Sequence, residues 1–267
     1  MKYVVVTGAY GGMGKATVNL LAQNGYTVFA LDKRVQESLD EKIIPIAIDI
    51  TQEESVKSAF LQINKRAERL EAIVHFAGIY MLDSLVEMSE ERFIRAFNVN
   101  LFGVYRVNKA FLPLLKQGSR IIITSSELAP LDPLPFTGIY AITKTAIEKY
   151  AYSLRMEVQL LGIKVSVIRP GAVKTGLLKS STDELDNFVE NTNINKCNAS
   201  RFKKIVESVE AKNVSPEKVA KKVFKALTKR CPRYIYNLNL NPLLKLLNIL
   251  PQRMQTAIIK GILKDKK

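Results

Sequence analysis

The sequence of 267 residues holds one histidine and two cysteines, and this scarcity argues against a metal centre or a disulfide framework. His75 has no second histidine with which to share a metal ion, so we interpret it as a packed residue at a strand end. Cys197 and Cys231 lack the spacing of metal ligands and are expected to be free thiols. No apolar run reaches the eighteen residues of a membrane-spanning helix. The apolar N-terminus leads into a glycine loop, and we recognise no targeting segment in it.

Acidic residues are scarce in the C-terminal quarter of the chain. Residues 196–267 contain 18 Lys or Arg and 4 Asp or Glu, a net charge of +14, whereas residues 1–195 contain 22 and 21, a net charge of +1. Apolar residues and lysines alternate at helical spacing in the extension 238–267, which is consistent with peripheral contact with an anionic membrane. The alternative is a helix packed on its own domain with solvated lysines. Nucleic acid is not expected, because no recognisable binding module accompanies the charge.

Short apolar runs alternate with longer segments that have the apolar spacing of helices. Continuous apolar strands separated by helices predict an α/β fold, a Rossmann-type doubly wound parallel sheet in a three-layer α/β/α arrangement. Pro45 marks its strand as an edge candidate, because proline cannot donate to a strand ladder. The expected strands are 3–7, 27–31, 43–48, 72–76, 120–124 and 163–168, and the expected helices are 13–24, 52–67, 89–116 and 139–161.

Length and composition favour one domain over residues 1–267. The segment 171–214 is rich in Ser, Asn, Thr and Lys, and we expect it to be an irregular loop. A loop of that length in a compact domain is usually functional, so we predict a substrate lid there.

The first predicted strand runs directly into a glycine-rich loop that opens a helix. Glycines let the backbone approach a pyrophosphate, which then lies at the helix N-terminus. The run Thr7–Lys15 therefore predicts a dinucleotide site, and a P-loop is excluded because Ala16 follows Lys15. The glycines fit two spacings, of which one is typical of short alcohol dehydrogenases and the other of sugar-nucleotide epimerases. The predicted cofactor contacts in this loop are Gly8, Tyr10, Gly11, Gly12, Met13 and Gly14.

Asp32 ends the second predicted strand, where a carboxylate accepts hydrogen bonds from a ribose diol and repels a 2′-phosphate. This favours NAD over NADP, although Lys33 and Arg34 could pair with such a phosphate. Asp49 and the adjacent Ile50 end the third strand, where they could contact the adenine; Asp49 could equally cap the next helix.

Tyr140 and Lys144 lie four residues apart on a predicted helix and so project from the same face. A phenol beside an ammonium group is expected to have a lowered pKa, which suits it to exchange a proton with an alcohol or ketone. The hydroxyl-bearing run Thr124–Ser126 precedes them. Asn100 is a polar residue in an otherwise apolar helix, where it either bends the helix or has a function.

These motifs together resemble the short-chain dehydrogenase/reductase family, in its short single-domain branch, and hydroxysteroid or retinol dehydrogenase-like members in particular. They occur in the family order over residues 3–175. The matching residues are Thr7-Gly8-x3-Gly12-x-Gly14, Asp32, Ala77-Gly78, Asn98-Val99-Asn100, Ser126, Tyr140-x3-Lys144 and Pro170-Gly171…Thr175.

The resemblance implies a role for each matching position. Tyr140 would be the general acid and base, Ser126 would polarise the substrate oxygen, and Lys144 would bind the nicotinamide ribose and lower the pKa of Tyr140. Asn100 would hold a water that links Lys144 to solvent. The further cofactor contacts implied are Ala77, Gly78, Pro170, Gly171, Val173 and Thr175.

Three departures from the family pattern stand out. Phe76 replaces the usual asparagine before Ala77-Gly78, which affects strand packing rather than chemistry. The gap from Ser126 to Tyr140 is one residue longer than usual, so Ser125 stays a minor candidate. The basic C-terminal extension is the third departure.

The expected activity is therefore NAD(P)-dependent hydride transfer between a nicotinamide and a secondary alcohol or ketone. The apolar loop before Tyr140 and the apolar C-terminus suggest a steroid- or lipid-like substrate. By resemblance, we expect a homodimer or homotetramer, in the cytoplasm or peripherally at a membrane. The alternatives are a nicotinamide-binding scaffold or redox sensor without turnover and, favoured only by Gly11, a sugar-nucleotide epimerase.

Overall fold

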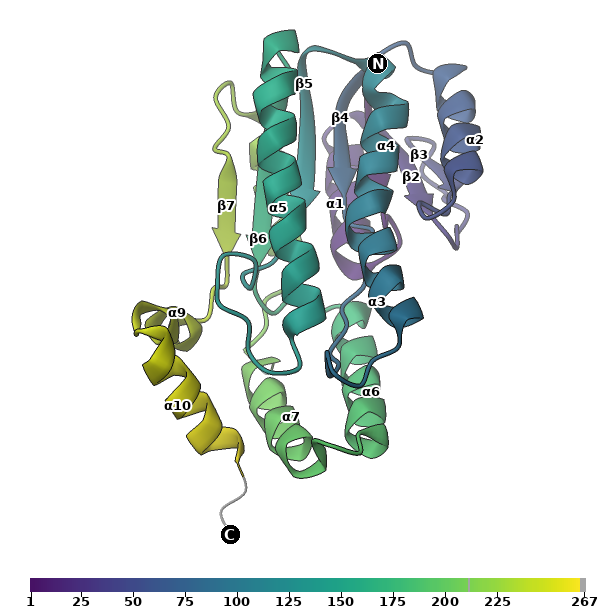
Figure 1. The fold of residues 1–267 in the computed structure, drawn as a ribbon. Coiled ribbons are helices and arrows are strands. Elements are labelled where there is room, and N and C mark those ends of the chain that lie inside the picture. Colours follow the sequence, from purple (N-terminus) through teal and green to yellow (C-terminus); the bar gives the residue numbers. More distant parts are fainter. Residues whose placement is uncertain (211, 265–267) are drawn as a thin grey trace.

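A computed structural model describes residues 1–210 and 212–264 of the chain, which form a three-layer α/β/α structure (Figure 1). Its central sheet has seven parallel strands in the order β3-β2-β1-β4-β5-β6-β7. The predicted doubly wound parallel sheet is thereby confirmed. The strands are β1 (Lys2–Thr7), β2 (Tyr26–Asp32), β3 (Ile43–Ala47), β4 (Leu70–His75), β5 (Leu115–Thr124), β6 (Lys164–Pro170) and β7 (Ile235–Leu238).

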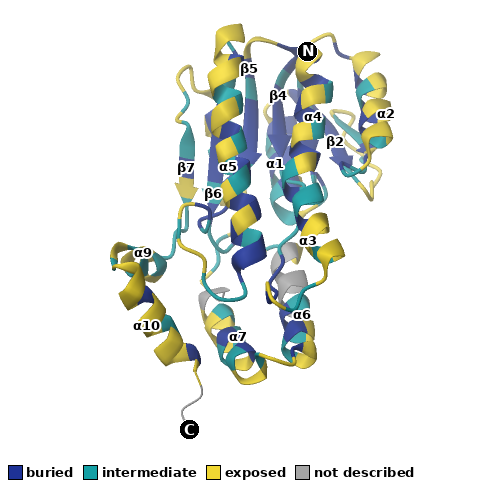
Figure 2. Ribbon diagram, viewed as in Figure 1, coloured by how far each residue is buried: buried dark blue, intermediate teal, exposed yellow. Residues whose placement is uncertain are grey.

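Helices cover both faces of the sheet because successive strand side chains point to opposite sides. On β1, Val5 packs with the helices of one face, whereas Val4 and Val6 pack with those of the other face. Figure 2 shows the buried sheet between helices whose outer faces are exposed. The helices are α1 (Gly12–Gln23), α2 (Glu53–Asn64), α3 (Glu90–Phe97), α4 (Gly103–Phe111), α5 (Gly138–Val158), α6 (Gly176–Asn191), α7 (Lys196–Glu210), α8 (Pro216–Thr228), α9 (Pro242–Ile249) and α10 (Gln252–Leu263).

Each predicted strand and helix is present, with shifted ends in several cases. The β3 strand is the sheet edge that Pro45 indicated. The expected helix 89–116 is α3 and α4 joined by a π-helical turn, Asn98–Phe102, and it ends before β5 begins at Leu115. Our sequence analysis missed β7, which is only four residues long and pairs with β6.

The prediction of an irregular conformation at 171–214 is wrong, because α6 and α7 occupy most of this segment, and its role as a substrate lid stays a prediction. Leu185 and Phe188 on α6 and Phe202 on α7 are buried together with Leu82. Among the side chains of these two helices that the structure describes, the polar ones are exposed or half-buried. The pair forms a helical layer below the sheet in Figure 1, next to the C-terminal helices.

The C-terminal extension folds into α9 and α10, which are joined by a short turn at Pro251. Leu263 at the end of α10 packs against the apolar cluster of α6 and α7. Among the helices described, none combines the length and apolar character required to cross a bilayer.

Candidate active site

The glycine loop between β1 and α1 can be built only from glycine at two positions. Gly8 has a φ of +67°, and a Cβ there would lie 2.5 Å from the backbone nitrogen of Ala77. A Cβ on Gly14 would overlap the carbonyl oxygen of Gly8. The loop therefore leaves its backbone and the start of α1 open to a ligand, and this shape fits a pyrophosphate at a helix N-terminus.

A cavity follows this loop along the carboxyl ends of β1, β2 and β4. Gly12 and Thr175 approach across it, since a Cβ on Gly12 would lie 2.7 Å from the Thr175 side chain. The predicted cofactor residues that line it are Gly8, Tyr10, Gly11, Gly12, Met13, Gly14, Asp32, Ile50, Ala77, Gly78 and Thr175. The residues brought together here are those that a dinucleotide would need.

The acidic residues at this end of the sheet have different roles. Asp32 lines the cavity and accepts a hydrogen bond from the backbone N–H of Tyr10 at 3.1 Å. Asp49 is absent from the cavity lining. Its carboxylate binds Lys33 at 2.8 Å and accepts from the N–H and hydroxyl of Thr51, and these bonds lower its pKa although burial opposes them. Lys33 is thus paired with Asp49.

Asn100 lies in the π-helical turn between α3 and α4, a feature that often marks functional sites. Its side chain is 3% exposed and satisfied on both sides. Its Oδ1 accepts from the N–H of Ile79 at 2.8 Å, while Nδ2 donates to the carbonyl of Ile79 and to the hydroxyl of Thr143. A Cβ on Gly78 would lie 3.2 Å from Asn100 Oδ1 and 3.8 Å from Lys144 Nζ. Asn100 therefore ties the β4 loop and α5 together beside Lys144.

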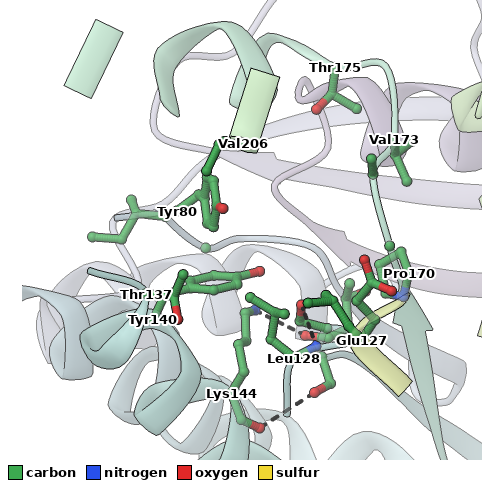
Figure 3. Close-up of a pocket in the computed structure, with 18 of the residues that line it drawn as sticks. Tyr80, Glu127, Leu128, Thr137, Tyr140, Lys144, Pro170, Val173, Thr175 and Val206 are labelled. Atoms are coloured by element: carbon green, nitrogen blue, oxygen red, sulfur yellow. Dashed lines mark hydrogen bonds between the residues drawn. The ribbon is translucent and has the colours of Figure 1, made fainter. Parts of the chain in front are cut away.

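Tyr140 and Lys144 lie in the first turns of α5, and both side chains line a second cavity (Figure 3). Lys144 Nζ lies 5.5 Å from the centre of the Tyr140 ring and donates to the carbonyl of Thr124. The hydroxyl of Ser126 hydrogen-bonds Tyr140, whereas that of Ser125 donates to the Lys144 carbonyl at 3.4 Å. The structure thus brings Ser126, rather than Ser125, to the phenol.

The expected lowering of the Tyr140 pKa is not what this cleft produces. Burial raises the pKa of Tyr140 to about 12, against the hydrogen bond from Ser126 and with the help of the Glu127 charge. Burial also lowers the pKa of Lys144 to about 8, with Glu148 opposing it. Desolvation outweighs charge attraction because both groups lie in the interior. The phenol therefore keeps its proton at neutral pH.

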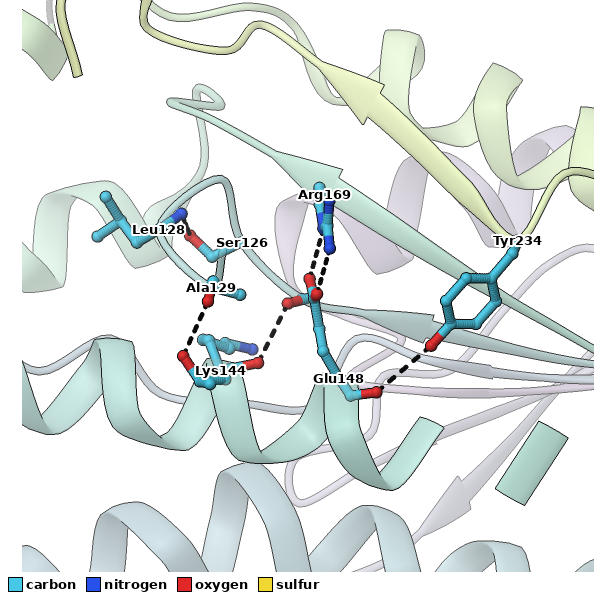
Figure 4. A network of polar contacts seen from close by, with 9 residues as sticks. Ser126, Leu128, Ala129, Lys144, Glu148, Arg169 and Tyr234 are labelled. Atoms are coloured by element: carbon cyan, nitrogen blue, oxygen red, sulfur yellow. Dashed lines mark hydrogen bonds and ion pairs between the residues drawn. The ribbon is translucent and has the colours of Figure 1, made fainter. Parts of the chain in front are cut away.

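An ion-pair network fixes α5 against β6 behind the site (Figure 4). Arg169 on β6 binds both carboxylate oxygens of Glu148 on α5. The Tyr234 hydroxyl donates to the Glu148 carbonyl at 3.3 Å. Since Glu148 follows Lys144 by one helical turn, this network sets the position of the helix that carries the two site residues.

The second cavity is mainly apolar and adjoins the first at Met13, Gly78 and Thr175. Pro170, Gly171 and Val173, three predicted cofactor residues, line it. Tyr80 lies edge-on to Tyr140, with ring centres 4.6 Å apart. The lining also includes Phe202, Ile205 and Val206 from the predicted lid segment and Leu244 from the apolar C-terminal extension, whereas sequence analysis named neither Tyr80 nor Glu127.

The lining residues from α7 and α9 lie far along the chain from Tyr140, and sequence analysis indicated their segments without the individual α7 residues. The helical apolar spacing of Phe202, Ile205 and Val206 was the one signal that could have indicated them. Glu127 directly follows Ser126, but a carboxylate there matches no motif.

A dinucleotide cradle beside a Ser-Tyr-Lys set in a cavity wall defines a nicotinamide-dependent oxidoreductase of the Rossmann type. The sequence matches the short chain dehydrogenase family over residues 2–186. The chain belongs to this family, and its cofactor is accordingly an NAD(P) dinucleotide.

Particular relatives resemble the chain over most or all of its length. It is 30% identical over 235 residues to the 3-ketodihydrosphingosine reductase of Bacteroides thetaiotaomicron, covering 86% of this chain and 85% of that protein. It is 34% identical over 192 residues to estradiol 17-beta-dehydrogenase 2 of Mus musculus, covering 67% of this chain and 50% of that protein. The structure of a short-chain dehydrogenase from Streptomyces avermitilis superimposes with a TM-score of 0.75 at 21% identity, and the match covers 99% of this chain and 98% of that one. The two proteins therefore share the fold.

Proposed function

We propose that this enzyme interconverts an apolar secondary alcohol and its ketone, with NAD as the cofactor. The observation that carries the proposal is the position of Tyr140 and Ser126 in the wall of an apolar cavity that adjoins the glycine-lined one. A ketone oxygen that accepts from both hydroxyls would lie within reach of a proton donor, which is the geometry that general acid catalysis needs.

The roles of the chain's residues follow from their surroundings. The bound nicotinamide supplies or takes the hydride. Tyr140, protonated at neutral pH in this cleft, would donate to a ketone oxygen, and Ser126 would hold that oxygen in place. Lys144 would hold the nicotinamide ribose and, with Asn100 and a water, return a proton to Tyr140.

The preference for NAD rests on charge at the end of β2. Asp32 faces the cavity with its carboxylate, which would repel a 2′-phosphate and accept from a ribose diol. Lys33 is paired with Asp49, so it is not the free cation that a 2′-phosphate would need. Arg34 and Arg95 also line the cavity, and these two cations are the argument for NADP.

The substrate class follows from the cavity wall. Leu134 before α5, the α7 residues Phe202, Ile205 and Val206, and Leu244 of α9 surround the space beyond Tyr140. A long or polycyclic apolar body would displace water from such a wall, and apolar burial stabilises by roughly 25 cal/mol per Å². The two curated relatives above are named for 3-ketodihydrosphingosine and estradiol, which supports this class.

The test follows NADH absorbance with a panel of ketones that have long-chain, steroid and short polar bodies. We expect oxidation of NADH with the long-chain or steroid members and little with the polar ones. Tight NADH binding without oxidation by any ketone would instead favour the scaffold, the alternative without turnover.

Self-association through α4 and α5 is part of the proposal. These helices lie side by side on one face of the sheet in Figure 1. Phe102 and Tyr105 at α4 and Tyr152 and Met156 on α5 are exposed. Burial of this surface against a second copy would give a homodimer, and two such pairs a homotetramer. Light scattering of the Tyr152→Glu variant would test it, with dissociation as the expected result.

We also propose that α9 and α10 contact an anionic membrane peripherally. Leu246, Ile249, Ile258 and Ile262 are exposed on these helices. Both helices lack acidic residues, and they contain Lys245, Arg253 and Lys260. A second copy of this surface would bring like charges together, whereas anionic lipid would neutralise them.

Flotation with vesicles tests this contact. We expect binding to phosphatidylglycerol-containing vesicles at low salt and none to phosphatidylcholine alone. The Leu246→Glu, Ile249→Glu variant should lose binding. Absence of wild-type flotation at low salt would end this part of the proposal.

A further inference from the structure

Glu127 is a buried carboxylate in the wall of the apolar cavity. It directly follows Ser126, its side chain is 8% exposed, and its backbone N–H donates to the carbonyl of Pro170 at 2.9 Å. Figure 3 shows it beside Pro170, with the Tyr140 ring on the other side of the cavity. A charge in such a wall is costly unless it has partners.

The two oxygens of this carboxylate have different surroundings. Oε2 accepts the backbone N–H of Asn241 at 2.5 Å, which fastens the start of α9. Oε1 lies beside Gly171, where a Cβ would be only 2.8 Å away, so a side chain at this position would crowd the oxygen. Burial raises the pKa of the carboxyl, while the Asn241 N–H and the charge of Lys245 lower it. An ionised carboxylate offers about four acceptor positions, and a single N–H fills one of them.

Resting on the proposed function, we infer that Glu127 binds a cationic head group of the substrate, an ammonium next to the carbon that reacts. An ammonium bound there would form a charge-assisted hydrogen bond to Oε1. Glu127 and Ser126 line the same cavity, so the cation and the ketone oxygen would belong to the same end of the substrate. The remaining apolar part of the molecule would extend toward Phe202, Ile205 and Leu244. The substrate class is thus a long-chain 2-amino ketone or its amino alcohol.

The experiment compares two long-chain 3-ketones that differ only in an ammonium at carbon 2, with NADH and the full-length enzyme. The readout is selectivity, the ratio of kcat/KM for the amino ketone to that for the plain ketone. We expect a ratio well above one for the wild type and a fall of roughly ten- to hundred-fold in Glu127→Gln. The glutamine oxygen can still accept from Asn241, so this change removes charge while it preserves the anchor of α9.

Asn241→Ala is the matched control. The Asn241 side chain caps α9 by accepting from the N–H of Leu243 at 2.9 Å, and its loss loosens α9 while Glu127 keeps its charge. The control should affect both ketones alike and leave the ratio within about two-fold of wild type. An equal loss of both activities in Glu127→Gln, or a wild type without preference for the amino ketone, would overturn the inference. If neither ketone is reduced by the wild type, the proposed function itself fails.

Discussion

Arg169 binds both carboxylate oxygens of Glu148, one helical turn beyond Lys144 on α5. Glu148 is the charge that opposes the lowering of the Lys144 pKa by burial. The ion pair therefore does two things, since it fastens α5 to β6 and keeps a negative charge near the site cation. Lys144 retains a pKa of about 8, which leaves it largely protonated at neutral pH.

Removal of the phenol hydroxyl should separate chemistry from cofactor binding. In Tyr140→Phe we expect a loss of kcat of at least about a hundred-fold, because general acid catalysis contributes roughly 10²–10⁴-fold. The dissociation constant of NADH, measured by fluorescence, should change little. Wild-type turnover in this variant would contradict the role of Tyr140.

Lys144 should reduce the stability of the folded protein at neutral pH. Below pH 8 both the folded and the unfolded state carry the proton, so the penalty of burying the cation is complete. As the pH rises from about 8 toward 10.5, the folded state loses its proton first and the penalty disappears. Lys144→Met removes this penalty, so the variant should be up to about 3 kcal/mol more stable than wild type at pH 7 although it should be inactive. Urea unfolding of the variant and the wild type at pH 7 and pH 9.5 measures this difference in stability. If the difference is the same at the two pH values, the predicted penalty for burying the Lys144 cation is wrong.

Asp32 should determine the choice between the two dinucleotides. Asp32→Ala removes the charge that disfavours a 2′-phosphate, while Arg34 stays in the cavity lining. We expect the NADH to NADPH ratio of kcat/KM to fall roughly ten- to hundred-fold, because a charged hydrogen bond is lost and a repulsion is removed. Steady-state kinetics with both cofactors measures the ratio, and an unchanged value would remove Asp32 from this role.

Gly14 should tolerate no side chain, whereas Gly261 should accept one. Gly14→Ala would force its Cβ into the carbonyl of Gly8, so we expect weaker NADH binding and a loss of roughly 1–3 kcal/mol of stability. The Cβ of Gly261→Ala, in α10, would meet no atom within 4 Å. That control should leave NADH binding unchanged and stabilise the helix by up to about 1 kcal/mol. Equal behaviour of the two variants in isothermal titration and thermal unfolding would contradict the packing argument.

Glu87 should hold the turn between α6 and α7 in place. Its carboxylate accepts from the Thr192 hydroxyl and from the backbone N–H groups of Asn193 and Ile194, and these bonds lower its pKa to about 2. The stabilisation from these hydrogen bonds is fully present above pH 4.5, and it is lost as the pH falls through about 2 and the carboxylate takes up a proton. Glu87→Ala should speed amide hydrogen exchange at residues 192–195 and raise KM for apolar substrates. If amide hydrogen exchange at residues 192–195 is the same in Glu87→Ala and wild type at pH 7, the Glu87 hydrogen bonds do not hold this turn.

The parts of the molecule that sequence could predict are those whose signal is local. The β1 loop needs glycine for steric reasons, and Tyr140 and Lys144 share a helix face, so their neighbourhood follows from spacing. The wall of the apolar cavity combines Tyr80, Glu127, Phe202 and Leu244, which only the tertiary fold brings together. Composition suggested a loop at 171–214 because, among the described side chains of α6 and α7, exposed and half-buried ones outnumber the buried ones. The balance of burial against charge at Tyr140 is likewise a property of the folded interior.

Pro45 in β3 and the shortness of β7 have a consequence for how copies of this enzyme can meet. Pro45 offers no N–H at one border of the sheet, and the other border presents only four residues. Neither border is a good template for an incoming extended chain, which protects the protein from edge-to-edge aggregation. Higher assemblies are therefore limited to contacts between helical faces, where side-chain complementarity rather than backbone pairing decides which molecules join.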